Sequence, residues 1–189
     1  MVIKRILKIS TFLFGVLFIV SSCTKEVDFS QAETIEANPV TQVSFLFFEV
    51  PASNFVTAGN QPNSISDFVD IDALDNTFVD ESLTKAELVF ETQNTVNKSY
   101  QVQIDLLNNA GVIVHTFDFL TPASTNNLPI TTSHVEVFDS NNNLAALKQT
   151  KSIAFTLSLL PGQALQPNAA GVLQLKSKGV FYFNIKNQE

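Results

Sequence analysis

Hydrophobic and polar positions alternate through most of the chain after residue 40. The first such segment, Val40–Val50, is apolar on both faces around Phe45–Phe48, which is typical of a central strand covered on both sides. Pro51 ends this segment because proline cannot donate to a strand ladder, and residues 51–66 are rich in turn-forming residues. The pattern predicts a β-strand followed by a long loop.

Residues 86–120 carry the clearest two-residue period, in three apolar rows. The rows are Leu88 and Phe90; Tyr100, Val102, Ile104 and Leu106; and Ile113, Phe117 and Phe119. Loops over residues 95–97 and 108–111 would place all three rows on one face, with Phe90 and Phe117 both opposite Val102. We therefore predict a three-stranded antiparallel meander.

Shorter signals continue toward the C-terminus. Val135 and Val137 indicate a short strand, and Leu144–Gln149 indicates one or two helical turns. Residues 152–159 alternate as a strand does. Residues 172–186 keep one parity across a glycine, which fits either a hairpin or one long strand bulged at that glycine.

The spacing of these segments predicts the fold class. Strands recur every 8–20 residues, and no long helical period appears after Cys23. We expect an all-β fold over residues 40–189, an antiparallel two-sheet β-sandwich of seven to nine strands, either immunoglobulin-like or jelly-roll-like. The absence of a fixed-period repeat argues against a propeller or a solenoid.

Residues 1–22 follow a different pattern. Three basic residues between positions 4 and 8 precede the apolar run Phe12–Val20, and Ser21-Ser22 lead to Cys23, the only cysteine of the chain. The run is shorter than the roughly 20 apolar residues that a membrane-spanning helix needs. The order of basic, apolar and small residues is typical of a helical signal peptide that is removed on secretion.

Val20-Ser21-Ser22-Cys23 resembles the lipobox of bacterial lipoproteins, and the chain is similar to small Bacteroidota envelope lipoproteins of unknown function. The resemblance implies that residues 1–22 are a lipoprotein signal peptide, that Cys23 receives a diacylglycerol, and that its new amine takes an acyl chain such as palmitate. Several acyl chains make a membrane anchor effectively permanent. Residues 23–39 would then be the lipidated cysteine and a flexible tether.

The residues after Cys23 bear on location. Thr24 stands where an inner-membrane retention signal has Asp, which implies the outer membrane. Residues 25–28, Lys-Glu-Val-Asp, are similar to acidic tags that direct lipoproteins to the cell surface, although Val27 interrupts the acids. The resemblance implies an outer-membrane anchor, with the cell surface favoured over the periplasmic side.

The charge of the mature chain excludes one class of partner. Without residues 1–22 the chain keeps eight Lys, no Arg and all 18 acidic residues, a formal net charge of −10. Nucleic-acid binding needs clustered basic residues, and arginine above all. We therefore expect no nucleic-acid partner.

The acidic loop of residues 67–81 is the main candidate for a binding site. Asp70, Asp72 and Asp75 could supply three of the oxygen ligands that Ca²⁺ prefers, but the glycine and closing Glu of an EF-hand loop are missing. A solvated acidic loop is the alternative. Asp139-Ser-Asn-Asn-Asn143 also superficially echoes a calcium loop, and we interpret it as a β-turn.

The residue types that usually perform catalysis are scarce. His115 lies in an apolar row and is expected to be a core or rim histidine, while His134 is expected to face outward into solvent. No G-x-S-x-G motif is present, and two histidines make no zinc site. The only aromatic residues with a polar group are Tyr100 and Tyr182, which does not favour sugar stacking.

These observations favour a lipid-anchored envelope β-sandwich with a non-catalytic binding or structural role, held by the lipid on Cys23 and facing a protein or glycan partner. The alternative is a calcium-dependent or glycan-binding module that uses the loop 67–81. A weaker alternative is an envelope hydrolase.

Overall fold

The computed structural model describes residues 36–56, 64–71, 74, 76–162, 164–166 and 168–186. The predicted signal peptide, Cys23 and the predicted tether up to residue 35 lie outside the described residues. The described residues belong to one unit, Glu36–Lys186. None of their helices is long and apolar enough to cross a membrane.

Strands dominate this unit. They are β1 (Glu36–Ala37), β2 (Val40–Pro51), β3 (Ser64–Asp70), β4 (Leu83–Asn94), β5 (Tyr100–Leu107), β6 (Ile113–Thr121), β7 (Ile130–Phe138), β8 (Ser152–Leu159), β9 (Val172–Phe183) and β10 (Ile185–Lys186). The short helical segments are η2 (Ala52–Phe55), α2 (Thr77–Ser82) and α3 (Leu144–Lys148). The last of these confirms the predicted helical turns.

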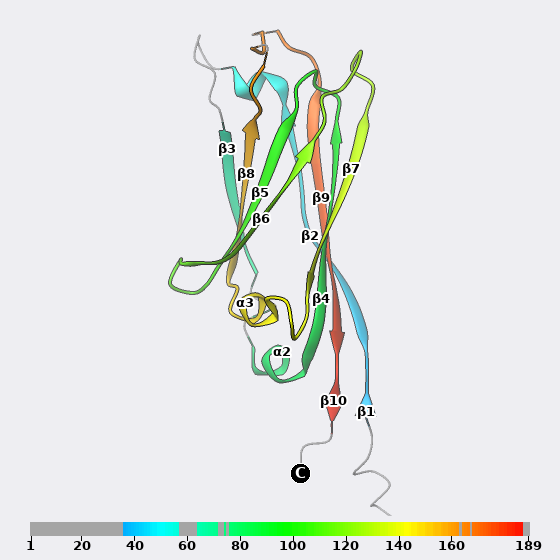
Figure 1. Ribbon diagram of the computed structural model, residues 1–189, viewed down its shortest axis with the longest axis vertical. Helices are drawn as coiled ribbons and strands as arrows, with labels where there is room; N and C mark the ends of the chain where they lie inside the picture. Colours follow the sequence, from blue (N-terminus) through cyan, green and yellow to red (C-terminus); the bar gives the residue numbers. More distant parts are fainter. Residues whose placement is uncertain are drawn as a thin grey trace, which may run out of the picture. The chain divides into compact units, whose positions relative to one another are not determined.

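Two four-stranded antiparallel sheets form the sandwich (Figure 1). The first sheet has the order β2-β9-β4-β7 and the second has the order β3-β8-β5-β6. β1 pairs with β10, and this small ribbon begins at Glu36, inside the segment predicted as tether. The predicted all-β antiparallel sandwich is confirmed.

The path of the chain decides between the two predicted sandwich types. Every connection from β2 to β9 passes from one sheet to the other, except the β5–β6 hairpin, which stays within the second sheet. Eight strands wound in this way over two sheets form a jelly roll. The fold is therefore jelly-roll-like rather than immunoglobulin-like.

The connections between consecutive strands lie alternately at the two ends of the sandwich (Figure 1). The β3–β4 connection with α2, the β5–β6 loop and the β7–β8 connection with α3 lie at one end. The β2–β3, β4–β5, β6–β7 and β8–β9 connections lie at the other. Segments far apart in sequence thus share one end, and we call the end that carries α2 and α3 the helical end.

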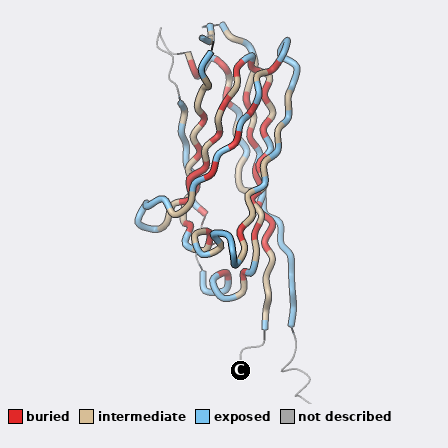
Figure 2. The backbone as a smooth tube through the Cα atoms, in the orientation of Figure 1, coloured by how far each residue is buried: buried red, intermediate tan, exposed pale blue. Residues whose placement is uncertain are grey.

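The core lies between the sheets, where buried positions alternate with more exposed ones along each strand (Figure 2). Phe90 of β4 packs against Phe117 and Phe119 of β6, with ring centroids 5.6 and 6.0 Å apart. Aromatic contacts of this kind join the two inner faces. The apolar rows predicted from the sequence therefore face a common interior, except for Ile113, which is 53% exposed.

The predicted β4–β5 hairpin is wrong, because β4 pairs with β7 and β9 and lies in the sheet opposite β5. The chain crosses from one sheet to the other between β4 and β5, and the buried side chain of Asn94 stabilises this connection. Its Nδ2 donates to the carbonyl oxygens of Lys98 (2.8 Å) and Pro122 (2.7 Å). Its Oδ1 accepts a hydrogen bond from Val96 N (2.8 Å). Apolar rows on neighbouring strands and on facing sheets point into the same core. The pattern alone could not separate the two arrangements.

The predicted β5–β6 hairpin is correct, but its register is shifted by two residues. Val102 pairs with Phe119 instead of Phe117, and a bulge between Leu106 and Leu107 precedes a longer loop, residues 108–112. A shift of two residues keeps every side chain on its face, so Phe117 and Phe119 face inward as predicted. Ile113 lies beyond the bulge and is 53% exposed, so its predicted inward position is wrong.

Strand pairing settles the question that the sequence left open over residues 172–186. β9 is one long strand, and at Gly179 an added Cβ would lie 2.5 Å from the Phe45 ring and 2.6 Å from the Phe181 ring, so glycine makes room for this aromatic pair. The predicted acidic loop 67–81 begins inside β3 and ends inside α2.

Candidate functional site

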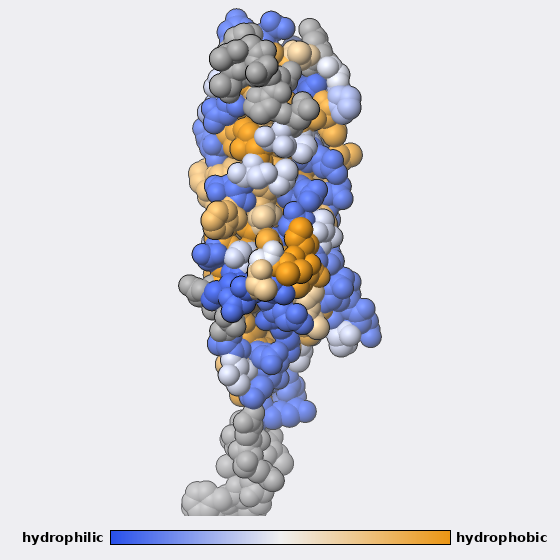
Figure 3. Space-filling view, turned by 90° about the vertical axis from the view of Figure 1, so that its left-hand side faces the viewer, coloured by the Kyte–Doolittle hydropathy of each residue, from blue (hydrophilic) through white to orange (hydrophobic). Residues whose placement is uncertain are grey.

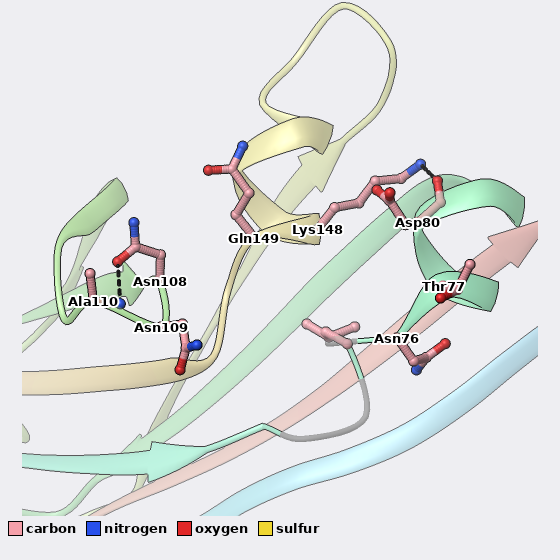
Figure 4. Close-up of a pocket in the computed structure, with 9 residues that line it drawn as sticks. Asn76, Thr77, Asp80, Asn108, Asn109, Ala110, Lys148 and Gln149 are labelled. Atoms are coloured by element: carbon pink, nitrogen blue, oxygen red, sulfur yellow. Dashed lines mark hydrogen bonds between the residues drawn. The ribbon is translucent and has the colours of Figure 1, made fainter.

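The three connections of the helical end line a cavity of about 660 Å³ that is open to solvent (Figure 4). The described residues that line it are Leu74, Asn76, Thr77, Asp80, Asn108, Asn109, Ala110, Lys148 and Gln149. They come from the β3–β4 connection, the β5–β6 loop and α3. Most of these side chains carry a hydrogen-bonding group, and only Leu74 and Ala110 are apolar.

Asn76 positions the part of the wall contributed by α2. It is the N-cap of this helix, and its Oδ1 accepts a hydrogen bond from Val79 N at 2.9 Å, which satisfies one of the free amides of the first turn. The helix that starts here places Thr77 and Asp80 three residues apart, on the same side. Capping by Asn76 therefore brings a hydroxyl and a carboxylate to the cavity.

Asn108 shapes the β5–β6 loop. Its Oδ1 accepts from the backbone N–H groups of Ala110 and Val112, each at 3.0 Å, and Gly111 closes the turn with φ of +70°. Asparagine and glycine favour such turns because they form local hydrogen bonds and tolerate positive φ. The amide of Asn108 is used within the loop, whereas the neighbouring Asn109 projects its amide from it (Figure 4).

Lys148 joins the third connection to the first. It lies in the last turn of α3, and its Nζ donates to the main-chain carbonyl oxygen of Asp80 in α2 (Figure 4). Gln149 follows as the C-cap of α3 and is one of the residues that line the cavity. One long side chain thus ties together two connections separated by more than sixty residues of sequence.

Four polar side chains of the wall have no hydrogen-bond partner within the part of the chain that the structure describes. They are the Thr77 hydroxyl, the Asp80 carboxylate and the amides of Asn109 and Gln149. Hydroxyl and amide groups both donate and accept, and the carboxylate accepts only. The cavity therefore offers a ready set of unused hydrogen-bonding groups to a polar molecule.

The outer face of the second sheet provides a contrast, because its polar side chains bond to one another. Ser66 pairs with Thr156 at 2.9 Å, and Gln101 donates to Asp118 at 2.9 Å. Figure 3 views the molecule from the side of this sheet, where hydrophobic residues gather in patches bordered by hydrophilic ones. This face satisfies its own polar groups, so the cavity is the stronger candidate site.

The predicted calcium ligands are only partly described. Asp70 ends β3, and its Oδ1 accepts a hydrogen bond from Ser152 Oγ at 2.7 Å, while Asp72 and Asp75 lie outside the described residues. Among the residues that are described, no group of three or more His, Cys, Asp or Glu could hold a metal ion. Calcium binding at Asp70, Asp72 and Asp75 remains a prediction.

The segment Asp139–Asn143 is a turn, as predicted. Asn142 N donates to Asp139 O at 3.0 Å, and Asn141 N donates to Asp139 Oδ1 at 2.8 Å. The side chain of Asp139 is thus used to hold the turn. It lies beside α3, on a second, smaller hollow of the helical end.

The two histidines meet at the edge of the sandwich where β6 and β7 face each other. His115 Nε2 lies 2.9 Å from Glu136 Oε1, and His134 Nε2 lies 3.4 Å from Glu136 Oε2. His115 is mostly buried, as predicted for a core or rim histidine. These contacts link the open edges of the two sheets.

The predicted outward orientation of His134 is wrong. Its ring stacks on Phe119 with centroids 5.0 Å apart and an angle of 7°, and β7 turns Val135 outward instead, 49% exposed. Phe90 and Leu88 face inward from β4, and they pair with His134 and Glu136, which therefore share the inner face. On this edge strand the polar residues close the core and the valine meets solvent, the reverse of the usual pattern.

Neither tyrosine offers a free ring for sugar stacking. Tyr100 is fully buried against Phe55, with ring centroids 5.2 Å apart, and burial raises the pKa of its phenol. Tyr182 is half-buried, and Lys85 Nζ lies 4.9 Å from its ring centroid.

Comparisons with known proteins leave the chain without a family. No family model and no curated protein matches it. Among solved structures, it is similar to the VP2 subviral particle of infectious bursal disease virus (15% identity, 79% of this chain, 38% of that chain, TM-score 0.42). It is also similar to PfGH50B (13%, 84% and 23%, TM-score 0.46) and to the enzymatically active domain of bacteriophage CBA120 tailspike protein 4 (12%, 82% and 20%, TM-score 0.34).

The chain spans less than half the length of each of these solved chains. The likenesses are remote, and the jelly-roll assignment rests on the strand order of the chain itself.

Several residues of the cavity were not predicted as site residues. Thr77 and Asp80 fall within the acidic loop 67–81, but Asn109 and Gln149 were interpreted only as parts of a hairpin loop and a helix. Their common feature in the sequence is an amide in a connection. Only the jelly-roll path brings those connections to one end.

Proposed function

We propose that this chain is a lipid-anchored envelope protein without catalytic activity, which binds a ligand in the cavity of the helical end. The observation that carries the binding role is the set of four unpartnered polar groups on three separate connections. The four side chains are exposed and line the same concave surface, so a ligand there can reach all of them. Groups left open on a concave surface are typical of a ligand site.

The anchor rests on the lipobox-like sequence Val20-Ser21-Ser22-Cys23 and on the signal pattern before it. Glu36, the first residue of β1, lies at the helical end (Figure 1), so a lipid on Cys23 would connect to the protein on the same side as the cavity. We place the anchor in the outer membrane and favour the cell surface. The ligand would then be a component of the envelope or of its surroundings.

The anchor is tested on protein isolated from native membranes. Mass spectrometry of the mature N-terminal peptide should find it beginning at Cys23 and carrying the mass of a diacylglycerol with a further acyl chain. The Cys23→Ser variant should lose this modification and leave the outer-membrane fraction. An N-terminal peptide without acyl groups in the wild type would contradict the proposal.

The binding role is tested separately, with a photo-cross-linking amino acid in place of Asn109. Position 141, an exposed asparagine in the neighbouring turn that does not line the cavity, is the matched control. In intact cells, position 109 should form a cross-linked product and position 141 should not. Equal labelling at both positions, or none at 109, would contradict a ligand in the cavity.

A further inference from the structure

We infer that the ligand of the cavity is a neutral oligosaccharide, an inference that rests on the proposed binding role. The unpartnered Asn109 and Gln149 amides and the Thr77 hydroxyl each offer both donors and acceptors. A sugar ring presents neighbouring hydroxyls that also donate and accept. The two amides and the hydroxyl lie on three walls of one cavity. Because each of them and each sugar hydroxyl can both donate and accept, every donor of one can be matched with an acceptor of the other.

The charge of the cavity favours an uncharged ligand. Its wall holds one ammonium, Lys148, and one carboxylate, Asp80, among the described lining residues. Lys148 Nζ is already hydrogen-bonded to the Asp80 carbonyl oxygen. This bond to a neutral carbonyl leaves the ammonium charge in place, but the one carboxylate offsets it, so the described wall has no excess positive charge to select a phosphate or an acidic sugar. The Asp80 carboxylate can accept hydrogen bonds from hydroxyl groups.

The size and the apolar part of the wall suit a short chain of rings. The cavity volume of about 660 Å³ falls within the range of small-molecule sites, roughly 300–1,000 Å³. Leu74 and Ala110 supply apolar surface that can meet the C–H face of a ring. No aromatic ring is among the described lining residues, so we expect weak binding, with a Kd on the order of 1 mM.

A peptide is a less suitable occupant. Peptides bind by adding a strand to a sheet edge or by placing apolar side chains in a groove. The cavity is bounded by loops and short helices rather than by a free strand edge, and only two of its described lining residues are apolar. The polar groups that line the cavity therefore suit the hydroxyl groups of a sugar better than the apolar side chains of a peptide.

The inference is tested by calorimetric titration of the full mature protein with three probes. These are a panel of neutral tetrasaccharides (glucan, mannan and N-acetylglucosamine types), an acidic oligogalacturonate and tetra-alanine. We expect at least one neutral tetrasaccharide to bind. Asn109→Ala and Gln149→Ala should each raise its Kd about tenfold, while the control Asn141→Ala should leave it within about twofold. All three residues are exposed, so their substitution leaves the core intact.

The possible failures point to different claims. If the acidic sugar or the peptide binds in the cavity and no neutral sugar does, the ligand class is wrong and the binding site stands. If a neutral sugar binds but Asn109→Ala and Gln149→Ala do not weaken it, the site itself is wrong. If no probe binds and the product cross-linked at position 109 contains no carbohydrate, the inference is overturned while the proposed binding role survives.

Discussion

The ammonium group of Lys148 donates a hydrogen bond to the main-chain carbonyl oxygen of Asp80, joining α3 to α2 across the rim of the cavity. The bond satisfies a carbonyl near the end of the short helix α2, which has no basic residue in its last turn. Because it links two connections that share no strand pairing, it holds the walls of the site at a fixed distance.

Replacing Lys148 with methionine keeps the apolar part of the side chain and removes this bond. We expect the global free energy of unfolding to fall by about 1 kcal/mol or less, as for a solvent-exposed hydrogen bond, while backbone amides of α2 exchange faster with deuterium. Hydrogen-exchange mass spectrometry compares the variant with Lys176→Met, a lysine on the outer face of the first sheet. Unchanged exchange in α2 would show that the bond does not hold the cavity.

Asn94 controls the crossover from β4 to β5, where its side chain makes three hydrogen bonds inside the protein. Asn94→Ala removes these three hydrogen bonds of a buried side chain, which we expect to lower the free energy of unfolding by about 3 kcal/mol. Urea denaturation measures the loss. Asn97→Ala, at an exposed position of the same connection, should lower the free energy of unfolding only slightly. A similar loss of stability in both variants would contradict the role of Asn94.

Gly171 and Gly111 form a second matched pair. Gly171 has φ of +103°, and an added Cβ would lie 2.6 Å from Thr95 O, whereas Gly111 has φ of +70° and open space around it. We expect Gly111→Ala to cost about 1 kcal/mol of backbone strain and Gly171→Ala to cost clearly more, because a backbone atom must move. Thermal unfolding of the two variants gives the comparison, and equal melting temperatures would contradict it.

Burial of Tyr100 predicts a loss of stability at alkaline pH. Its folded-state pKa lies above the ordinary 10.0, because the ionised phenol is excluded from the core. The neutral Tyr100 therefore contributes its full share to the free energy of unfolding below pH 10. Above pH 10 this share is lost progressively, because the phenol ionises in the unfolded chain before it ionises in the folded protein. Stability measured against pH should fall less steeply above pH 10 in Tyr100→Phe than in the wild type.

The same variant also tests the buried hydroxyl. Tyr100 Oη has no hydrogen-bond partner in the described structure, so Tyr100→Phe should match or exceed the wild-type stability at neutral pH. Tyr182→Phe is the control, because the Tyr182 hydroxyl does have a partner, Glu87 Oε1 at 3.4 Å, and its removal should not raise the stability at neutral pH. A large loss of stability in Tyr100→Phe at pH 7 would show that the hydroxyl has a partner.

The sequence predicted the composition of the core better than its topology. The inward rows of β5 and β8, and Phe117 and Phe119 of β6, follow from strict alternation, because burial of one face leaves a period of two. The prediction that Val40–Val50 is a central strand covered on both faces is wrong, since β2 is an edge strand and Phe47 is 61% exposed. The β4–β5 hairpin was predicted wrongly because Phe90 faces Val102 across the core just as well as it would face it within a sheet. The hydrogen bonds of Asn94 stabilise the connection that crosses to the other sheet. They depend on the tertiary fold, so no local sequence pattern predicts them.

The site was harder to predict for the same reason. Asn109 and Gln149 are ordinary loop and helix-end residues in the sequence, and they become neighbours only when the β5–β6 loop and α3 reach the same end. His134 was assigned to solvent because Val135 and Val137 suggested the opposite parity. Its stacking on Phe119 depends on β6 lying across from β7, which again follows from the crossing connections.

The most direct test of the central claim is to follow the side-chain amide signals of Asn109 and Gln149 by nuclear magnetic resonance. The labelled mature protein is titrated with a protein-free extract of its own cell envelope. If the three connections form one ligand site, the amide signals of Asn109 and Gln149 shift together and those of Asn141 stay in place. Unmoved signals at Asn109 and Gln149, with shifts elsewhere on the protein, would contradict the claim.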